Sequence, residues 1–233
     1  MGRLIDRNRR KRAKEAKAVR MVDIRKEAAR SFVKLPYVEV TLDAIGRRAG
    51  VKKGIASMYF GSREELFLEL MRIELGEWFD AVQKALESHP ARLKPVRMAR
   101  IIAASLAERL VLCRFLALAP VAFEQNMDII ESFRLHRWQL ERMTELGQAL
   151  EKRSQALEDG AGVRLLHRVL LFVAGIQPYA DPRGSLSVNL LDPDFEALRL
   201  DMATEVEREV LRSLVSSRES TKKSKVQSPK SKV

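Results

Sequence analysis

Apolar residues recur every three or four positions along most of the chain, which is the spacing of an amphipathic α-helix. The first such stripe, from Val19 to Phe32, predicts a helix over residues 16–34, and Pro36 disfavours its continuation. Further stripes predict helices in the body of the chain at about 95–112, 114–126, 128–157, 161–179 and 194–216. No alternating run of useful length is present, so we expect an all-α protein.

Three more helices are predicted between residues 41 and 87. Thr41 is a good N-cap for a short helix that Gly50 ends. A second short helix covers about 52–59, and a longer one covers 63–87 behind Ser62 and Glu65, which form a capping box. Gly54 lies inside the second helix, where it costs about 1 kcal/mol relative to alanine. We therefore expect another backbone to approach it closely.

Charge is distributed unevenly along the chain. The net charge of the 233 residues is +12, and residues 1–63 alone hold 18 lysines and arginines against six acidic residues. Residues 216–233 hold six basic residues against one acidic residue, whereas the stretch between is mildly acidic. A basic N-terminal unit joined to an acidic body indicates a nucleic-acid-binding protein. For the basic tail, an aid to solubility remains an equal alternative.

Two short helices joined by a glycine-containing turn form a helix-turn-helix candidate, in which the second helix enters the major groove of DNA. The stretch "TLDAIGRRAGVKKGIASMYFGSREELF" resembles the DNA-binding domain of the tetracycline-repressor (TetR) family of transcriptional regulators. The residues in register with that family's pattern are Thr41, Asp43, Ile45, Ala49, Gly50, Val51, Lys53, Gly54, Tyr59, Phe60, Ser62, Glu64, Glu65 and Leu66. Its departures are Pro36, Ile55, Ala56 and Ser57, which stand for Gly, Thr, Leu and Tyr.

The resemblance and the residue chemistry together predict the DNA-binding residues. Lys53 can donate to guanine, Gly54 admits the DNA backbone, and the remaining polar residues suit phosphate contacts. The predicted set is Thr41, Lys52, Lys53, Gly54, Ser57, Tyr59 and Arg63, with Arg9, Arg10 and Arg12 from the basic arm. We expect that arm either to enter the minor groove or to act as a nonspecific electrostatic tether.

The resemblance divides the chain into four parts. Residues 1–15 are a basic, disordered arm, and residues 16–63 are a three-helix helix-turn-helix DNA-binding domain. Residues 64–216 are a helical-bundle ligand-binding and dimerisation domain, and residues 217–233 are a basic, disordered tail. In this arrangement, an effector bound in the body changes the spacing of two DNA-reading helices in a homodimer.

The body contains a candidate effector pocket. The predicted helix 128–157 has two polar residues, Arg137 and Thr144, in an otherwise apolar stripe, and a polar group on an inward face can orient a ligand. The alternative is a plain bundle core with a surface arginine. The pocket residues that we predict are Met98, Phe123, Phe133, Arg137, Leu140, Thr144 and Phe172.

The last two predicted helices pair with their copies in a partner chain, according to the resemblance. Their apolar band is wider than one core face requires, and its second half has heptad-like spacing. The predicted interface residues are Leu166, Val169, Leu170, Val173, Leu198, Met202, Val206 and Val210. Such a dimer predicts a pseudo-palindromic operator.

Other functional classes are poorly supported. The chain has three histidines and one cysteine, none in a metal-binding or nucleophile motif, so we expect no metal, no cofactor and no enzymatic activity. No apolar run is long enough to span a bilayer, and we expect a cytoplasmic protein. The sequence favours a DNA-binding regulator, most simply a repressor. The alternatives are a ligand-independent dimeric regulator and a nonspecific nucleic-acid- or membrane-associated helical protein.

Overall fold

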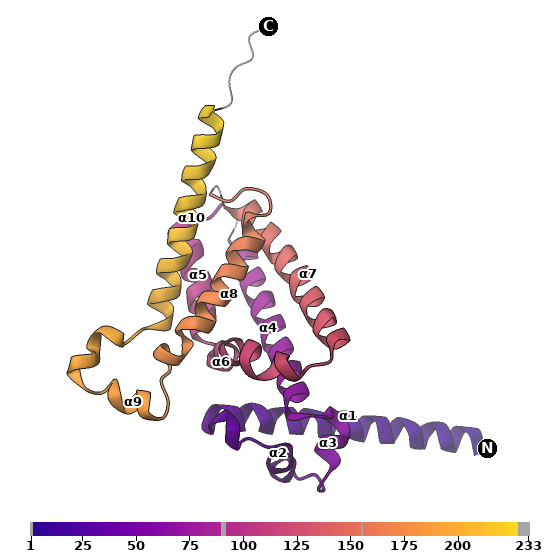
Figure 1. Cartoon of the computed structure of the whole chain (residues 1–233). Coiled ribbons are helices and arrows are strands. Elements are labelled where there is room, and N and C mark those ends of the chain that lie inside the picture. The colour runs from indigo at the N-terminus through magenta and orange to yellow at the C-terminus, as the bar shows by residue number, and fades with distance from the viewer. Residues whose placement is uncertain (1, 90–91, 155, 228–233) are drawn as a thin grey trace. The chain divides into compact units, whose positions relative to one another are not determined.

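The computed structural model describes residues 2–89, 92–154 and 156–227, with side chains except those of 2–11, 13, 126 and 217–227. The described chain is helical throughout, without a named β-strand, as predicted (Figure 1). It forms two compact units. The N-terminal unit comprises Met1–Met71 with Ala122–Met127, and the C-terminal unit comprises Arg72–Val121 with Asp128–Val233.

The N-terminal unit contains α1 (Gly2–Lys34), α2 (Leu42–Arg48), α3 (Ile55–Phe60) and the first turns of α4 (Arg63–Glu87). These helices enclose a small apolar core, because each contributes the face that the sequence pattern makes apolar. An aromatic cluster extends this core. The Phe67 ring lies 5.1 Å from Phe32, 5.7 Å from Tyr37 and 5.8 Å from Phe123, measured between ring centroids. The buried core residues include Ile24, Ala28, Phe32, Ile45, Ala56, Phe60, Leu66, Phe67 and Phe123.

Both ends of the chain are more helical than the sequence predicted. We expected a disordered arm at 1–15, but α1 begins at Gly2. We also expected a disordered tail at 217–233, but α10 (Met202–Gln227) continues through its first part, and 228–233 lie outside the described residues. Both segments are rich in lysine and arginine, which are good helix formers. Each continues a helix that is already packed, so no new nucleus has to form.

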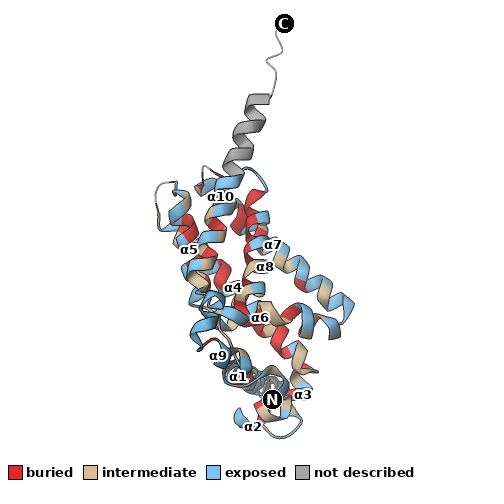
Figure 2. Ribbon diagram, turned by 60° about the vertical axis from the view of Figure 1, so that its left-hand side comes forward, coloured by how far each residue is buried: buried red, intermediate tan, exposed pale blue. Residues whose placement is uncertain are grey.

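The C-terminal unit contains the rest of α4 and six further α-helices of the described chain. They are α5 (Pro95–Ala107), α6 (Leu110–Leu118), α7 (Ile129–Arg153), α8 (Ala161–Ala180), α9 (Ser185–Asn189) and α10. Helix α8 packs against α6, α7 and α10, and α10 also packs along α5. Buried residues therefore lie on α8 and on the helices that pack around it, and Figure 2 shows them in red.

Two glycines set how closely α7 and α8 approach. A Cβ atom built on Gly162 would lie 2.2 Å from the carbonyl oxygen of Gly147, and one built on Gly147 would lie 2.7 Å from the backbone nitrogen of Val163. The two backbones are thus in direct contact at this crossing, where only glycine fits.

The predicted helix boundaries are partly confirmed. Helix α4 covers 63–87 as predicted. Ser62 caps its start, because the Ser62 hydroxyl accepts a hydrogen bond from the Glu65 amide at 3.0 Å. The last helix begins at Met202 rather than at 194. Pro193–Leu198 instead forms a short 3₁₀ helix, in which the Asp192 carboxylate accepts a hydrogen bond from the Asp194 amide.

Candidate nucleic-acid interface

Helix α2 is positioned by its cap and by a tight turn after it. The Thr41 hydroxyl accepts a hydrogen bond from the Ala44 amide at 3.2 Å, so Thr41 is engaged as the N-cap that the sequence predicted. After the helix, the Val51 amide donates to the Gly46 carbonyl at 3.0 Å, and Gly50 adopts a positive φ of 70°. These bonds turn the chain from α2 towards α3.

Gly54 has a different position from the one predicted, while close approach to the DNA backbone stays a prediction. It lies before α3, not inside it, with φ 81° and ψ −14°, a left-handed conformation that side chains disfavour. Its carbonyl accepts the first helical hydrogen bond, from the Met58 amide at 3.0 Å. The turn geometry therefore requires glycine here even without DNA. A Cβ on Gly54 would have no neighbour within 4 Å, so the position is also open to the outside.

The turn before α3 and one side of α3 are exposed, and the turn is basic. Lys52, Lys53 and Gly54 are exposed in the turn, and Ser57 and Met58 are exposed on the helix. Ala56 and Phe60 are buried beneath them and hold α3 against the core. Met58 is 68% exposed, although it is a large apolar side chain. We therefore add Met58 to the candidate contact residues, because its exposure shows that it does not pack in the core.

Arg63 is bound within the N-terminal unit. Its guanidinium donates to the carbonyls of Tyr37 and Val40, at 3.2 and 3.0 Å, and forms an ion pair with Glu64 at 2.8 Å. The Tyr37 hydroxyl donates to the same carboxylate at 2.7 Å. These bonds join the start of α4 to the segment before α2. These bonds give Arg63 a structural role within the unit, whereas its predicted phosphate contact stays a prediction.

The two acidic groups of this network have perturbed pKa values. Burial raises the pKa of Tyr37, and its hydrogen bond to Glu64 raises it further. For Glu64, burial alone would raise the pKa, but the hydrogen bonds donated by Tyr37 and Arg63 lower it. At neutral pH the phenol therefore keeps its proton and the carboxylate stays charged, which preserves the network.

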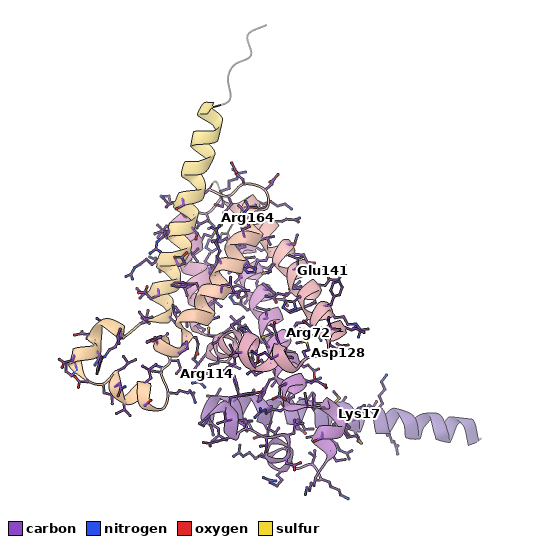
Figure 3. All side chains as sticks on the ribbon, viewed as in Figure 1. Lys17, Arg72, Arg114, Asp128, Glu141 and Arg164 are labelled. Atoms are coloured by element: carbon purple, nitrogen blue, oxygen red, sulfur yellow. The ribbon has the colours of Figure 1, made fainter. Side chains whose placement is uncertain are left out.

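Tyr59 lies on α3 next to α1. The ammonium nitrogen of Lys17 is 5.3 Å from the centre of the Tyr59 ring, within cation–π range. Figure 3 labels Lys17 on α1 beside α3. Arg12 is exposed on the same helix, while the side chains of Arg9 and Arg10 lie outside the described residues. The backbone of all three arginines is helical, so they do not belong to an extended arm.

The seven predicted effector residues do not line one site. Met98 is fully buried in the core of the C-terminal unit, and Phe172 packs at its edge. Phe123 belongs to the N-terminal unit, where its ring lies 5.3 Å from Tyr37. Thr144 borders a polar cavity of about 680 Å³, but its hydroxyl already donates to the Leu140 carbonyl at 2.7 Å.

The phase of α7 explains part of this correction. Phe133 and Leu140 are 61% and 55% exposed, and the Arg137 guanidinium covers the Phe133 ring at 4.9 Å. The helix carries a second apolar stripe, and that stripe faces the core; it consists of Leu135, Met143, Leu146 and Leu150. The sequence alone did not decide between the two stripes.

The predicted dimer residues are mostly core residues of their own chain. Of the eight, only Leu198 is exposed, and Met202 packs partly against the core. The other six residues are buried in the core; they are Leu166, Val169, Leu170, Val173, Val206 and Val210. The apolar band on α8 is wide because three helices of the same chain contact it, which corrects the predicted interface.

The described residues offer little support for other chemistry. Burial raises the pKa of the Cys113 thiol to about 12, so it remains protonated at neutral pH. No group of metal-binding side chains occurs within the described part of the chain. Within the same residues, none of the helices combines the length and apolar character that crossing a membrane requires.

Comparisons with known proteins agree with this geometry. Residues 24–70 match the family "Bacterial regulatory proteins, tetR family", and residues 73–216 match the family "Tetracyclin repressor-like, C-terminal domain". A comparison with curated proteins finds no match. The first of these families covers the helix-turn-helix, and the second covers most of the C-terminal unit.

One solved structure supports this fold, and another is similar at a lower score. The chain is similar to the fatty acid degradation regulator FadR from Bacillus halodurans, with a TM-score of 0.53 and 14% identity over 84% of this chain and 94% of that one. It is also similar to a putative TetR-family transcriptional regulator from Mesorhizobium loti, with a TM-score of 0.49 and 18% identity over 86% and 96% of the two chains. Since its C-terminal family match alone covers more than half of its length, the chain belongs to the TetR family of DNA-binding transcriptional regulators, which are not enzymes.

Proposed function

We propose that this regulator represses transcription and is released from its operator when a small molecule binds in the C-terminal unit. The observation that carries the DNA-reading part is the exposed side of the helix-turn-helix. Lys52, Lys53 and Met58 face outwards there, while Ala56 and Phe60 fix α3 from behind. DNA is the partner, so we place the protein in the cytoplasm.

Lys53 is our candidate for base reading. It is exposed in the turn before the N-terminus of α3, and in helix-turn-helix proteins this second helix enters the major groove. A lysine there can donate to guanine O6 and N7. We assign phosphate contacts to Lys52, Ser57 and Tyr59. Thr41 can contribute to phosphate binding only by its place at the exposed start of α2, because its hydroxyl already caps that helix.

Replacing Lys53 with alanine should relax base preference. We expect Lys53→Ala to weaken binding to the preferred duplex by about 1–3 kcal/mol, with a smaller loss on random duplex. Fluorescence anisotropy at a fixed salt concentration measures both affinities. Lys26→Ala is the control, since it removes the same exposed charge from α1. If both variants lose affinity equally on every duplex, Lys53 does not read bases.

We propose that the protein acts as a homodimer, as its family implies. The interface must use residues that the single chain leaves exposed. Leu171 and Tyr179 on α8 are 62% and 43% exposed, and Val215 on α10 is 45% exposed. These apolar side chains replace the buried residues that the sequence predicted. A C2 dimer of this kind requires a pseudo-palindromic operator.

Effector release is tested by adding small molecules to the complex with DNA. Compounds that raise the unfolding temperature of the free protein are selected first, because a ligand stabilises the state that it binds. We expect at least one of them to lower the affinity for the preferred duplex by a factor of about 5–150, the usual size of such coupling. Compounds that bind without changing DNA affinity would support a ligand-independent regulator.

A further inference from the structure

The first 22 residues of α1 are an addition to the part of the chain that the family pattern covers. The N-terminal match begins at residue 24, whereas α1 begins at Gly2. At 1.5 Å per residue, residues 2–23 form a rod of about 33 Å. Figure 1 shows the N-terminal half of α1 continuing well past α2 and α3.

Where the side chains of this rod are described, most of them are exposed. Every residue from Lys14 to Arg20 is exposed, and so is Arg12. Among the described side chains of α1, Met21 is the first that is half-buried and Ile24 is the first that is buried. Over residues 2–20 the sequence holds nine basic residues and two acidic ones. Such a helix repels itself electrostatically, and a polyanion beside it would remove that repulsion.

One side of the rod borders the reading helix. The Lys17 ammonium lies over the Tyr59 ring of α3, so the side of α1 that carries Lys17 faces α3. Lys14 and Arg20 are three residues before and after Lys17, and residues three apart are neighbours on a helix surface. These three exposed side chains form a basic ridge beside α3, which we call the α1 ridge.

We infer that the α1 ridge binds phosphates next to those that α3 contacts, so that α1 is a second DNA-binding element. A helix about 10–12 Å in diameter does not fit a minor groove about 6 Å wide. The helical form of residues 2–15 therefore favours phosphate contacts over the minor-groove arm, which was one of the two alternatives from the sequence. The ridge contributes affinity without base preference, because phosphate contacts carry no sequence information. This inference rests on DNA binding by α3.

The salt dependence of binding tests the inference. Each phosphate contact adds about 0.9 to the slope of log affinity against log salt concentration on duplex DNA. Because the proposed dimer carries two α1 ridges, we expect Lys17→Gln to lower the magnitude of this slope by about 2, and the triple variant Lys14→Gln, Lys17→Gln, Arg20→Gln to lower it by about 5. Lys17→Arg should keep the wild-type slope. Circular dichroism checks that the variants remain helical.

Lys26→Gln is the matched control. Lys26 is exposed on the same helix, two and a half turns from Lys17 and so on the opposite side. We expect the wild-type slope for this variant. Equal slopes for Lys17→Gln and Lys26→Gln would overturn the inference, as would a change of base preference in the triple variant. Wild-type preference for one duplex, measured first, shows whether α3 itself binds as proposed.

Discussion

Gly162→Ala is expected to destabilise the C-terminal unit strongly. The new Cβ atom would lie 2.2 Å from the Gly147 carbonyl oxygen, which is backbone and cannot move aside as a side chain could. Helices α7 and α8 would have to separate, and the packing between them would loosen. We expect a loss of about 3 kcal/mol in the free energy of unfolding, measured by urea denaturation.

Gly76→Ala is the control for that experiment. Gly76 also lies inside a helix of the C-terminal unit, but its added Cβ would meet only Trp138, at an ordinary 3.6 Å. We expect no loss of stability, and a gain of up to about 1 kcal/mol from the better helix former. A Gly162→Ala protein as stable as Gly76→Ala would show that the α7–α8 crossing is not as close as described.

Phe123→Ala is expected to have the second large effect. Phe123 is fully buried, and its ring lies 5.3 Å from Tyr37 and 5.8 Å from Phe67. Although it is far away in sequence, it completes the aromatic cluster of the N-terminal unit. Removing a buried phenylalanine ring costs about 3–5 kcal/mol, so we expect the amides of α1 to α4 to exchange faster with deuterium.

Phe133→Ala is the control that distinguishes the core role of Phe123 from a role in effector binding. Both phenylalanines were predicted as pocket residues, but Phe133 is 61% exposed on α7. We expect its replacement to change stability by no more than about 0.5 kcal/mol. If Phe123→Ala were equally mild, Phe123 would not be a core residue of the N-terminal unit, and a ligand-binding role would have to be considered again.

The local signals in the sequence predicted the helix-turn-helix well. Thr41 and Ser62 act as the caps that their chemistry suggests, and α4 has the predicted length. The exposed side of Lys52, Lys53 and Ser57 also follows from the apolar spacing of Ala56 and Phe60. Caps and spacing are interactions between near neighbours, so a single sequence contains them.

Features that depend on distant contacts were not predictable in the same way. The core position of Phe123 required a contact with Phe67, which is 56 residues away in the sequence. Similarly, the apolar band of α8 could face either a partner or its own chain, and the choice depends on α6, α7 and α10. Gly54 was misplaced for a local reason, because its backbone angle, which decides where α3 begins, is not visible in the sequence. Arg63 was predicted as a phosphate contact from its basic side chain, and nothing in the sequence indicates its bonds to the Tyr37 and Val40 carbonyls.

Selection from a pool of randomised duplexes tests the central claim most directly, namely that the side of the unit bearing Lys53 reads a DNA sequence. The full-length protein is incubated with the pool at physiological salt, and the bound duplexes are amplified and sequenced. We expect one pseudo-palindromic sequence to be enriched and to bind at least about 10³-fold more tightly than random duplex. Enrichment of no sequence, with equal affinity for all duplexes, would contradict the account.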